Sequence, residues 1–332
     1  MGNFLEKLKT FKLRRDDASS PPNTDENVST QLKPSRRWQM MDRTFGWKMS
    51  WVLMIVLTAF ALMPAQIQAQ TPSPTPNSNQ EQVPIIMYHL VTENSRYVGK
   101  YGIRPSELKS DLQYLKDNGY NTITMADLIS FVKTGKALPK NPIILTFDDG
   151  NSSDHAFLLP LLQEYDMKAV ISILGKTTDE ITEKHAKTPN GKYPNLTWGQ
   201  VIELHNSGIV EIQSHGYNVH GKSGSGKLKR ESDDAYHQRL LSDLQKLQDL
   251  CEEHLGAKPT TFCYPLGIIS KESRAVLEEL GFVASLSCQE GMNVITQGDN
   301  DCLFKLNRVN RASGRSVENI LEKLLRDVEK KK

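Results

Sequence analysis

The sequence predicts an α/β domain folded as a distorted (β/α)7-type barrel, on three observations. Short apolar runs such as Ile143–Phe147 and Ala169–Leu174 alternate with amphipathic stretches along the chain. Runs that are apolar throughout are typical of strands covered on both faces of a parallel sheet. About seven strand–helix repeats favour a closed or nearly closed barrel over an open sheet. With 332 residues and a formal net charge of +2, the chain is long enough for one sizeable core.

The strands are expected wherever a short apolar run is bounded by turn-forming or polar residues. In chain order they are Val83–Tyr88, Asn121–Thr124, Ile143–Phe147, Ala169–Leu174, Ile209–Ile212, Thr261–Tyr264 and Val283–Leu286.

The helices are expected where leucines recur every three or four residues after a capping residue. Ser106 begins a helix with Leu108, Leu112 and Leu115 on one face, and Gly119 ends it. Thr197 and Ser232 are N-cap candidates for two later helices. The remaining helices are expected at Ala126–Lys133, Phe157–Tyr165, Ser270–Leu280 and Val317–Val328.

The first 82 residues differ in composition from the rest. Residues 1–50 form a basic, polar tail, and residues 51–69 are expected to be a signal peptide or a membrane anchor. The uncharged part of that segment has about 15 residues, short for a spanning helix and suited to a signal peptide that ends near Ala69. Residues 70–82 are expected to be a flexible linker. We therefore expect residues 83–332 to be extracellular or at the cell surface, tethered to a membrane if the segment is uncleaved.

The overall charge bears on the binding partners to be expected, and the cysteine content bears on disulfide bonds. The near-neutral balance predicts no nucleic-acid partner, and we expect a monomer, since no protein-binding motif is present. The four cysteines fall in the last quarter of the chain, and an exported protein could oxidise them. Their pairing is open, with a Cys288–Cys302 disulfide and four free thiols as alternatives.

The most informative segment is Thr146–Gly150, which carries Asp148 and Asp149 at the end of a buried strand. Two adjacent carboxylates there cost energy unless a metal ion or a proton lies between them. His215 and His220 follow another predicted strand, so one aspartate and two imidazoles make a plausible divalent-metal site. The histidines are five positions apart, so the chain must turn between them if both bind one ion.

With Phe262–Gly267 as a third element, these segments resemble the signature of polysaccharide deacetylases, the NodB-homology domain of carbohydrate esterase family 4. Tyr88-His89 is similar to the branch that acts on poly-N-acetylglucosamine. The resemblance covers about residues 83 to 315. It implies removal of N-acetyl groups from amino sugars of a surface polysaccharide, either poly-N-acetylglucosamine or peptidoglycan.

The resemblance also implies a role for each site residue. Asp149, His215 and His220 would hold a divalent metal ion, with zinc as first choice and cobalt or nickel as alternatives. Asp148 would be the general base, which removes a proton from the attacking water. The remaining implied roles are a backbone N–H at Tyr264 that binds the oxyanion and a general acid at His89.

The chain departs from the family pattern at several positions. Gly216 follows the first histidine, where many members carry threonine or serine, and Cys263 stands where an arginine is usual. Val283–Gly291 has no tryptophan, and residues 304–308 have no histidine. These departures leave two other functions open: a glycan-binding module without turnover and a small-molecule amidase. The glycine- and lysine-rich stretch 221–230 is either a solvated loop or a mobile lid.

Overall fold

The structure is a computed structural model, and it describes residues 79–188, 192 and 194–330. The predicted basic tail and the signal or anchor segment lie outside the described residues. Within the described part of the chain, no helix is long and apolar enough to cross a membrane. The predicted linker overlaps the described residues at its end, where strand β1 (Gln80–Val83) begins before residue 83 and pairs antiparallel with β11 (Asn293–Thr296).

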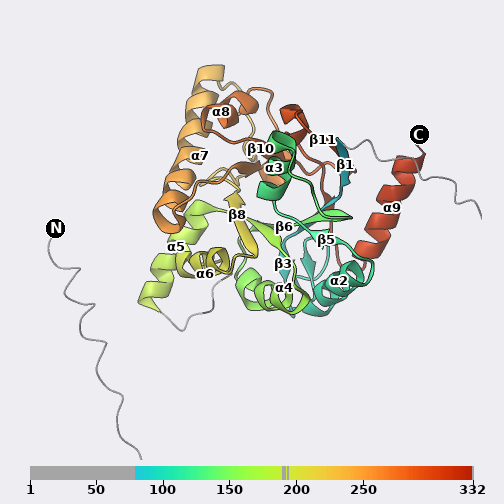
Figure 1. Ribbon diagram of the computed structural model, residues 1–332. Coiled ribbons are helices and arrows are strands. Elements are labelled where there is room, and N and C mark those ends of the chain that lie inside the picture. The colour runs from blue at the N-terminus through green and yellow to red at the C-terminus, as the bar shows by residue number, and fades with distance from the viewer. Residues whose placement is uncertain (1–78, 189–191, 193, 331–332) are drawn as a thin grey trace, which may run out of the picture. The chain divides into compact units, whose positions relative to one another are not determined.

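A curled parallel sheet forms the centre of the domain (Figure 1). Its strands run in the order β10-β9-β8-β7-β6-β2-β12, and Leu306, just before β12, pairs with Leu286 of β10. The predicted α/β fold with a barrel-like sheet is therefore confirmed. The bounds are β2 Ile85–Tyr88, β6 Pro142–Asp149, β7 Ala169–Ile173, β8 Val210–Ser214, β9 Thr261–Cys263, β10 Ala284–Leu286 and β12 Val309–Asn310. The short strands are β3 Leu90–Val91, β4 Gly102–Ile103 and β5 Asn121–Thr122.

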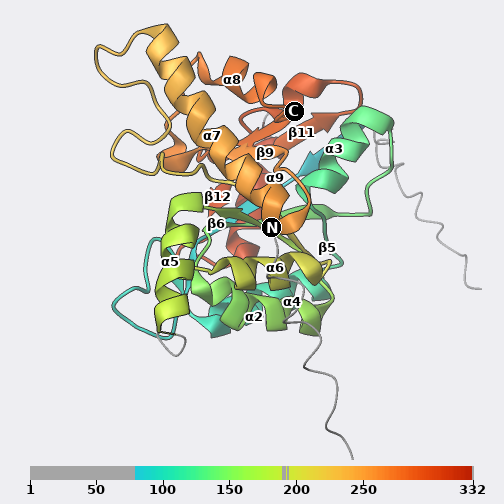
Figure 2. The ribbon, with the colours of Figure 1, turned by 90° about the vertical axis from the view of Figure 1, so that its left-hand side faces the viewer.

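Helices surround the sheet and pack against their neighbours, α9 on α2, α2 on α4, and α5, α6, α7 and α8 in succession (Figures 1 and 2). Thr197 and Ser232 cap α6 and α7 as predicted, each accepting a hydrogen bond from a backbone N–H three residues on. The bounds are α2 Pro105–Asp117, α3 Met125–Thr134, α4 Leu159–Tyr165, α5 Gly175–Lys187, α6 Trp198–Asn206, α7 Asp233–Leu255, α8 Ser273–Glu279 and α9 Val317–Glu329. Short helical turns are η2 Asp154–Leu158, η3 Pro265–Gly267 and η4 Asn300–Leu303.

Two features were not expected from the sequence, and a third decides between the two alternatives for the cysteines. Helix α5 has a polar sequence and buries only Gly175, Thr178 and Ile181, so it gives no apolar periodicity. The π-helical turn η2 precedes α4, which begins at Leu159 rather than Phe157. All four cysteines are free thiols, Cys288 and Cys302 included.

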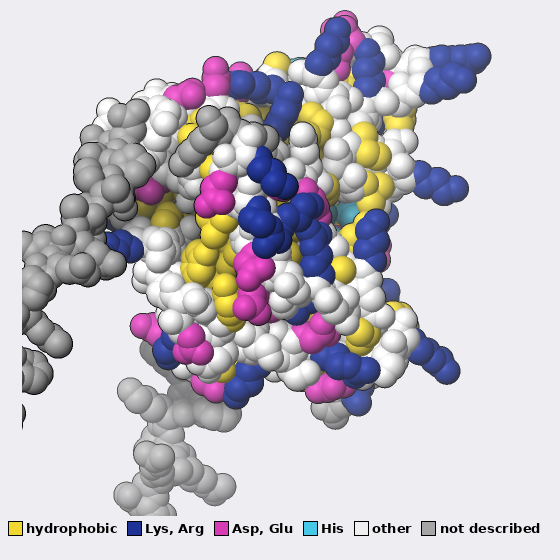
Figure 3. Space-filling model, turned by 90° about the vertical axis from the view of Figure 1, so that its right-hand side faces the viewer, with side chains coloured by type: hydrophobic (Ala, Val, Ile, Leu, Met, Phe, Trp, Pro, Cys, Tyr) yellow, Lys and Arg dark blue, Asp and Glu magenta, His cyan; other side chains and the backbone are white. Residues whose placement is uncertain are grey.

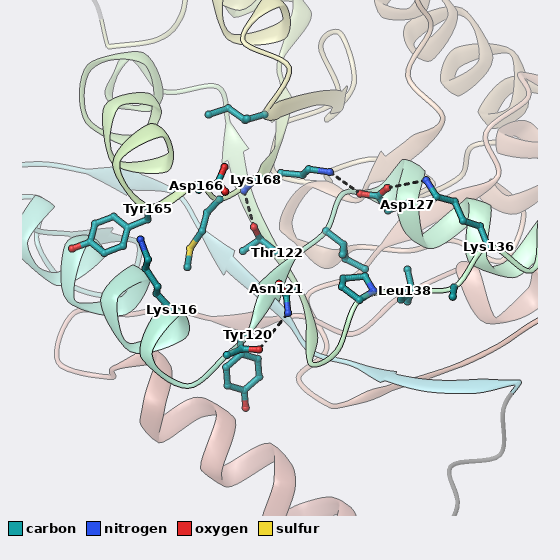
Figure 4. Close-up of a pocket in the computed structure, with 16 residues that line it drawn as sticks. Lys116, Tyr120, Asn121, Thr122, Asp127, Lys136, Leu138, Tyr165, Asp166 and Lys168 are labelled. Carbon is teal, nitrogen blue, oxygen red and sulfur yellow. Dashed lines mark hydrogen bonds and ion pairs between the residues drawn. The ribbon is translucent and has the colours of Figure 1, made fainter.

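The two ends of the sheet differ in chemistry. At the ends where the strands begin, a pocket is lined by Lys116, Asn121, Asp127 and Lys168 (Figure 4). Asp127 is already paired there, with its carboxylate 3.4 Å from Lys168 Nζ and 3.9 Å from Lys136 Nζ. In a barrel of this kind the functional residues gather at the opposite, carboxyl ends of the strands.

The outer surface carries charges of both signs. On the face seen in Figure 3, lysine and arginine side chains project with aspartate and glutamate between them, and hydrophobic side chains reach the surface in separate groups. Large apolar side chains of the strands are fully buried against the surrounding helices, among them Ile86, Leu145, Phe147 and Ile171.

Candidate active site

The two aspartates of β6 face different surroundings because they are consecutive in a strand. Asp148 is 2% exposed, whereas the Asp149 side chain is 28% exposed. Asp149 has a φ of 76° and Gly150 a φ of 62°, so the chain leaves the strand in the left-handed region. This turn places both carboxyl groups at the carboxyl end of the sheet.

Asp148 forms a bidentate ion pair with Arg308, which sequence reasoning missed. The Arg308 Nη1 and Nη2 atoms donate to Oδ1 and Oδ2 of Asp148 at 2.8 and 2.9 Å. Arg308 is fully buried, and its Nε donates to the carbonyl of Ser287. The position expected to carry the family's arginine holds Cys263, whose Sγ donates to Asp148 Oδ1 at 3.4 Å. A guanidinium therefore reaches the aspartate from the segment before β12 instead of from β9.

The ion pair sets the protonation of Asp148. Burial by itself would raise the pKa of this carboxyl group, but the Arg308 guanidinium, His215 and His89 together hold it well below its usual range. Asp148 is consequently ionised at neutral pH.

Asp149, His215 and His220 come together as predicted. The Asp149 Oδ1 atom is 3.5 Å from His215 Nε2 and 3.4 Å from His220 Nε2, and one ligand atom from each residue lies within 4.8 Å of the others. Asp149 Oδ1 is buried and has no hydrogen-bond partner among the described residues. His215 Nδ1 lies 2.8 Å from the carbonyl of Cys263, which fixes Nδ1 as the donor and leaves Nε2 as the acceptor. These donors fit a divalent cation.

The predicted turn between the histidines is present. Gly216 has a φ of 87°, and a Cβ at this position would lie 2.3 Å from the Val219 side chain. The Asp243 carboxylate of α7 accepts from the backbone N–H groups of Tyr217 and Asn218 at 2.8 Å each. Glycine is therefore required where many family members carry threonine or serine, and the five-residue spacing is closed by a turn anchored on α7.

His89 lies beside the same group. Its Nε2 is 4.0 Å from Asp148 Oδ2, and its ring contacts the Tyr101 ring at a centroid distance of 4.8 Å. The buried Nδ1 of His89 has no partner among the described residues. His155, the other histidine near the aspartates in sequence, instead pairs with Glu203.

Tyr264 does not match its expected role. Its N–H donates to the carbonyl of Leu286 at 3.0 Å as part of the pairing between β9 and β10, so it is not available to an oxyanion. The Tyr264 ring is buried, and its hydroxyl contacts Ser273. Leu266, two residues on, has a φ of 59° and lines the cavity described below. The residue of this segment that faces the site is therefore Leu266.

The stretch 221–230 is buried at its centre, residues 224–226, and exposed at both ends. Ser225 is buried and its hydroxyl donates to the carbonyl of Ile268, while Tyr236 donates to the carbonyl of Ser225. A Cβ at Gly224 would lie 2.6 Å from the carbonyl oxygen of Pro265. These contacts make the centre of the stretch a support for the segment that carries Leu266, while residues 221–223 and 228–230 are exposed, as the solvated-loop interpretation expects.

A cavity of about 560 Å³ joins these groups. It is lined by both aspartates of β6, both histidines after β8, and residues from other strand ends that include His89, Leu266 and Asn310. A volume of this size is in the range of small-molecule binding sites.

The comparisons with known proteins agree with this geometry. Residues 135–285 match the family described as polysaccharide deacetylase. The chain resembles that family over this segment, which is a little under half of its length. The structure of a de-N-acetylase from Aggregatibacter actinomycetemcomitans aligns with a TM-score of 0.62 and 25% identity, over 73% of this chain and 99% of the other. A deacetylase from Streptococcus pyogenes in complex with acetate aligns with a TM-score of 0.59 and 22% identity, over 74% of this chain and 99% of the other.

Two of the curated relatives carry the same printed name. A poly-beta-1,6-N-acetyl-D-glucosamine N-deacetylase from Escherichia coli K12 is 26% identical over 65% of this chain and 35% of its own length. The enzyme of the same name from Staphylococcus aureus is 22% identical over 63% of this chain and 68% of its own length. The chain therefore matches only about a third of the E. coli relative. The predicted resemblance to the NodB-homology family is confirmed.

Proposed function

We propose that this domain hydrolyses the acetamide of N-acetylated amino sugars in a surface polysaccharide and releases acetate and a free amine. One observation carries the proposal: Asp149, His215 and His220 converge beside the buried carboxylate of Asp148 in a single cavity. The printed names of the curated relatives favour poly-N-acetylglucosamine as the polymer, with peptidoglycan as the alternative. Acting on such a polymer would place the domain at the cell surface, held to a membrane if residues 51–69 remain attached.

Asp148 is the general base of the proposed reaction. Its two oxygens each accept one bond from Arg308, and a carboxylate has about four lone-pair positions, so acceptor capacity for a water molecule remains. The low pKa keeps Asp148 ionised, and Arg308 fixes its orientation. Proton transfer to a positioned carboxylate is typically worth a factor of about 10² to 10⁴ in rate.

Asp149, His215 and His220 would hold a divalent ion, which would supply a Lewis acid for the acetyl carbonyl and lower the pKa of a water molecule. Zinc is the first choice, and cobalt or nickel would suit the same ligands. His89 lines the cavity close to Asp148 and is the candidate donor of the proton that the leaving amine requires. The Leu266 N–H replaces that of Tyr264 as the candidate donor to the oxyanion.

The test is acetate release from poly-N-acetylglucosamine and from peptidoglycan by the purified protein, stripped of metal and reloaded with zinc, cobalt or nickel. Asp148→Asn should keep the fold and the bound metal while acetate release falls by at least about 10². His155→Gln serves as the control, since His155 pairs with Glu203 instead of lining the cavity. Unchanged release by Asp148→Asn contradicts the base assignment.

The same experiment separates the alternatives. Tight polymer binding without acetate release under any metal would indicate a glycan-binding module, and turnover of small amides at the same rate as polymer would indicate an amidase.

A further inference from the structure

A second pocket lies at the end of the sheet opposite to the aspartates and histidines of the candidate active site (Figure 4). Its walls are the end of α2, strand β5, α3 with the loop that follows it, and the turn between α4 and β7. Its volume of about 530 Å³ is close to the 560 Å³ of the candidate active site and in the range of small-molecule binding sites. The proposed chemistry gives this pocket no role.

Lysine side chains supply the excess charge of the pocket. Lys116, Lys136 and Lys168 line it together with Asp127 and Asp166, which gives three positive charges against two negative ones. The lysines belong to three different segments, and in Figure 4 Lys116 and Lys136 lie on either side of β5. A ligand in the pocket would therefore meet ammonium groups on more than one side.

Asp127 is the acidic partner of two of these lysines, but other donors already use its carboxylate. Its Oδ2 accepts from the backbone N–H and the hydroxyl of Thr124 in the capping box of α3, at 3.2 Å each. The Nζ of Lys168 lies 3.4 Å from the same oxygen, and that of Lys136 lies 3.9 Å from Oδ1. Both distances exceed the roughly 2.8 Å of a close charge-assisted hydrogen bond. The two ammonium groups thus share one carboxylate, and each has N–H donors left for a ligand.

The third lysine, Lys116, has no carboxylate partner among the described residues. Its Nζ instead lies over the ring of Tyr165, 5.6 Å from the centroid. An ammonium group can contact an aromatic face and still donate hydrogen bonds to another group. Lys116 is exposed, and binding an anion would not require it to break an ion pair.

The pocket is held in shape by hydrogen bonds around β5. This strand pairs with the start of β6, and the backbone N–H of Lys168 donates to Thr122 Oγ1 at 2.7 Å. Asn121 Nδ2 donates to the carbonyl of Lys140 at 2.7 Å, which ties β5 to the loop after α3. The ammonium groups are therefore presented around a preformed pocket. Its remaining walls include apolar and aromatic side chains, among them Tyr120, Leu138, Met167 and Ile209.

We propose that this pocket binds a phosphate ester. The phosphate group would lie among the three lysines, and the organic part of the ligand would pack on the rings of Tyr120 and Tyr165. Lysine carries a compact charge with three donors and is a common phosphate ligand. Arginine, which pairs with a carboxylate through two parallel hydrogen bonds, does not occur among the lining residues. The inference does not depend on the proposed deacetylase function.

The pocket and the candidate active site lie at opposite ends of the same strands. A phosphate ester bound in the pocket would leave the cavity of the candidate active site uncovered. The ester could belong to a soluble small molecule or to a phosphodiester polymer. A polymer bound there would hold the domain in place while the other cavity stayed accessible to substrate.

The experiment is calorimetric titration of the purified protein with glycerol phosphate, with a synthetic glycerol-phosphate hexamer and with succinate. The pocket variants are Lys116→Met, Lys136→Met and Lys168→Met. Lys271→Met is the matched control, because it removes the same charge from a side chain that is 89% exposed and outside the pocket. Wild type and the control should bind glycerol phosphate equally. Each pocket variant should bind it about tenfold more weakly, because one charge-assisted hydrogen bond is lost.

The comparison between variants isolates this pocket. Binding of phosphate at the candidate metal site would be common to all of them, so it cannot produce a difference. Circular dichroism identifies any variant that fails to fold, and the other two then carry the test. The site is refuted if wild type shows no saturable binding, or if the folded pocket variants bind like wild type. It is also refuted if Lys271→Met loses as much affinity as they do, or if succinate binds as tightly as glycerol phosphate.

The hexamer identifies the source of the ester. An affinity that exceeds that of glycerol phosphate by more than the roughly sixfold expected from the number of phosphates supports the site and indicates a polymer. A smaller gain supports the site and indicates a small ester. If wild type releases no acetate but binds glycerol phosphate through these lysines, the deacetylase proposal fails and the phosphate site stands.

Discussion

Replacing Arg308 by methionine should destabilise the protein and make its stability depend on pH. The substitution removes both charge-assisted hydrogen bonds to Asp148 and leaves a carboxylate that is 2% exposed without its counter-charge. Removing one partner of a buried ion pair typically costs about 3 to 5 kcal/mol. A loss of this size is a large part of the total stability of a single domain.

The pH dependence follows from the direction of the pKa change. In wild type, the folded-state pKa of Asp148 lies below its unfolded value, so the pair contributes stability that is fully present above about pH 4 and is lost as the pH falls. Without Arg308, burial raises the folded-state pKa above the unfolded value, so the folded protein binds a proton more tightly and loses stability as the pH rises. The difference in the free energy of unfolding between Arg308→Met and wild type should therefore grow from pH 5 to pH 8. It should grow by up to about 1.4 kcal/mol for each pH unit below the raised pKa of Asp148.

The assay is urea unfolding of metal-free wild type, Arg308→Met, Asp148→Asn and the double variant at pH 5, 6.5 and 8. The double variant removes both charges, so its stability should show no contribution from this pair at any of the three pH values. The double variant should lose less unfolding free energy than the two single variants lose together, because the two residues are in direct contact. A loss below about 1 kcal/mol in Arg308→Met at pH 8, or the same loss at all three pH values, would refute the argument that Arg308 compensates a buried charge.

Three further predictions concern the supports of the site. Gly216→Ala places a Cβ against Val219 at a residue with a positive φ. We expect this variant to bind less zinc, as measured by elemental analysis, while its circular dichroism spectrum stays near normal. A full zinc content would contradict the need for glycine at this position. Asp243→Ala removes the acceptor for two N–H groups between the histidines and should weaken zinc affinity by about 10- to 100-fold in calorimetry, whereas an unchanged affinity would show that the turn holds without α7. Arg311→Met leaves the buried Asp111 without its counter-charge, with only the Tyr88 hydroxyl and the Val317 N–H still donating to it, and should cost about 3 to 5 kcal/mol in urea unfolding; a loss near zero would count against the pair.

The sequence predicted which residues come together at the candidate metal site, because they lie at or after strand ends. Asp149 and His215 each come directly after an apolar run, and parallel strands bring their carboxyl ends to one side of a sheet. Gly216 signalled the turn between the histidines, since a glycine permits the left-handed backbone that the spacing requires. At these positions the local sequence pattern was sufficient to predict which residues lie close together and where the chain turns.

The sequence did not predict the counter-charge or the residue that faces the site after β9. Arg308 precedes a two-residue strand whose pairing with β2 joins segments more than 200 positions apart, and no local pattern encodes that pairing. Leu266 replaces Tyr264 because the backbone takes a φ of 59° at a leucine, where composition predicts no such turn. Arg308 was not predicted because its position depends on long-range strand pairing, and Leu266 was not predicted because its position depends on an unusual backbone conformation.

The origin of Arg308 has a consequence for how the protein matures. Strand β6 brings Asp148 into the apolar interior about 160 residues before the arginine that neutralises it is synthesised. A chain emerging from the ribosome or from a translocation channel therefore holds a carboxylate with no counter-ion until its last strand arrives. The site is completed only when β12 docks beside β2, so the segment that carries Arg308 to the Asp148 carboxylate also closes the sheet.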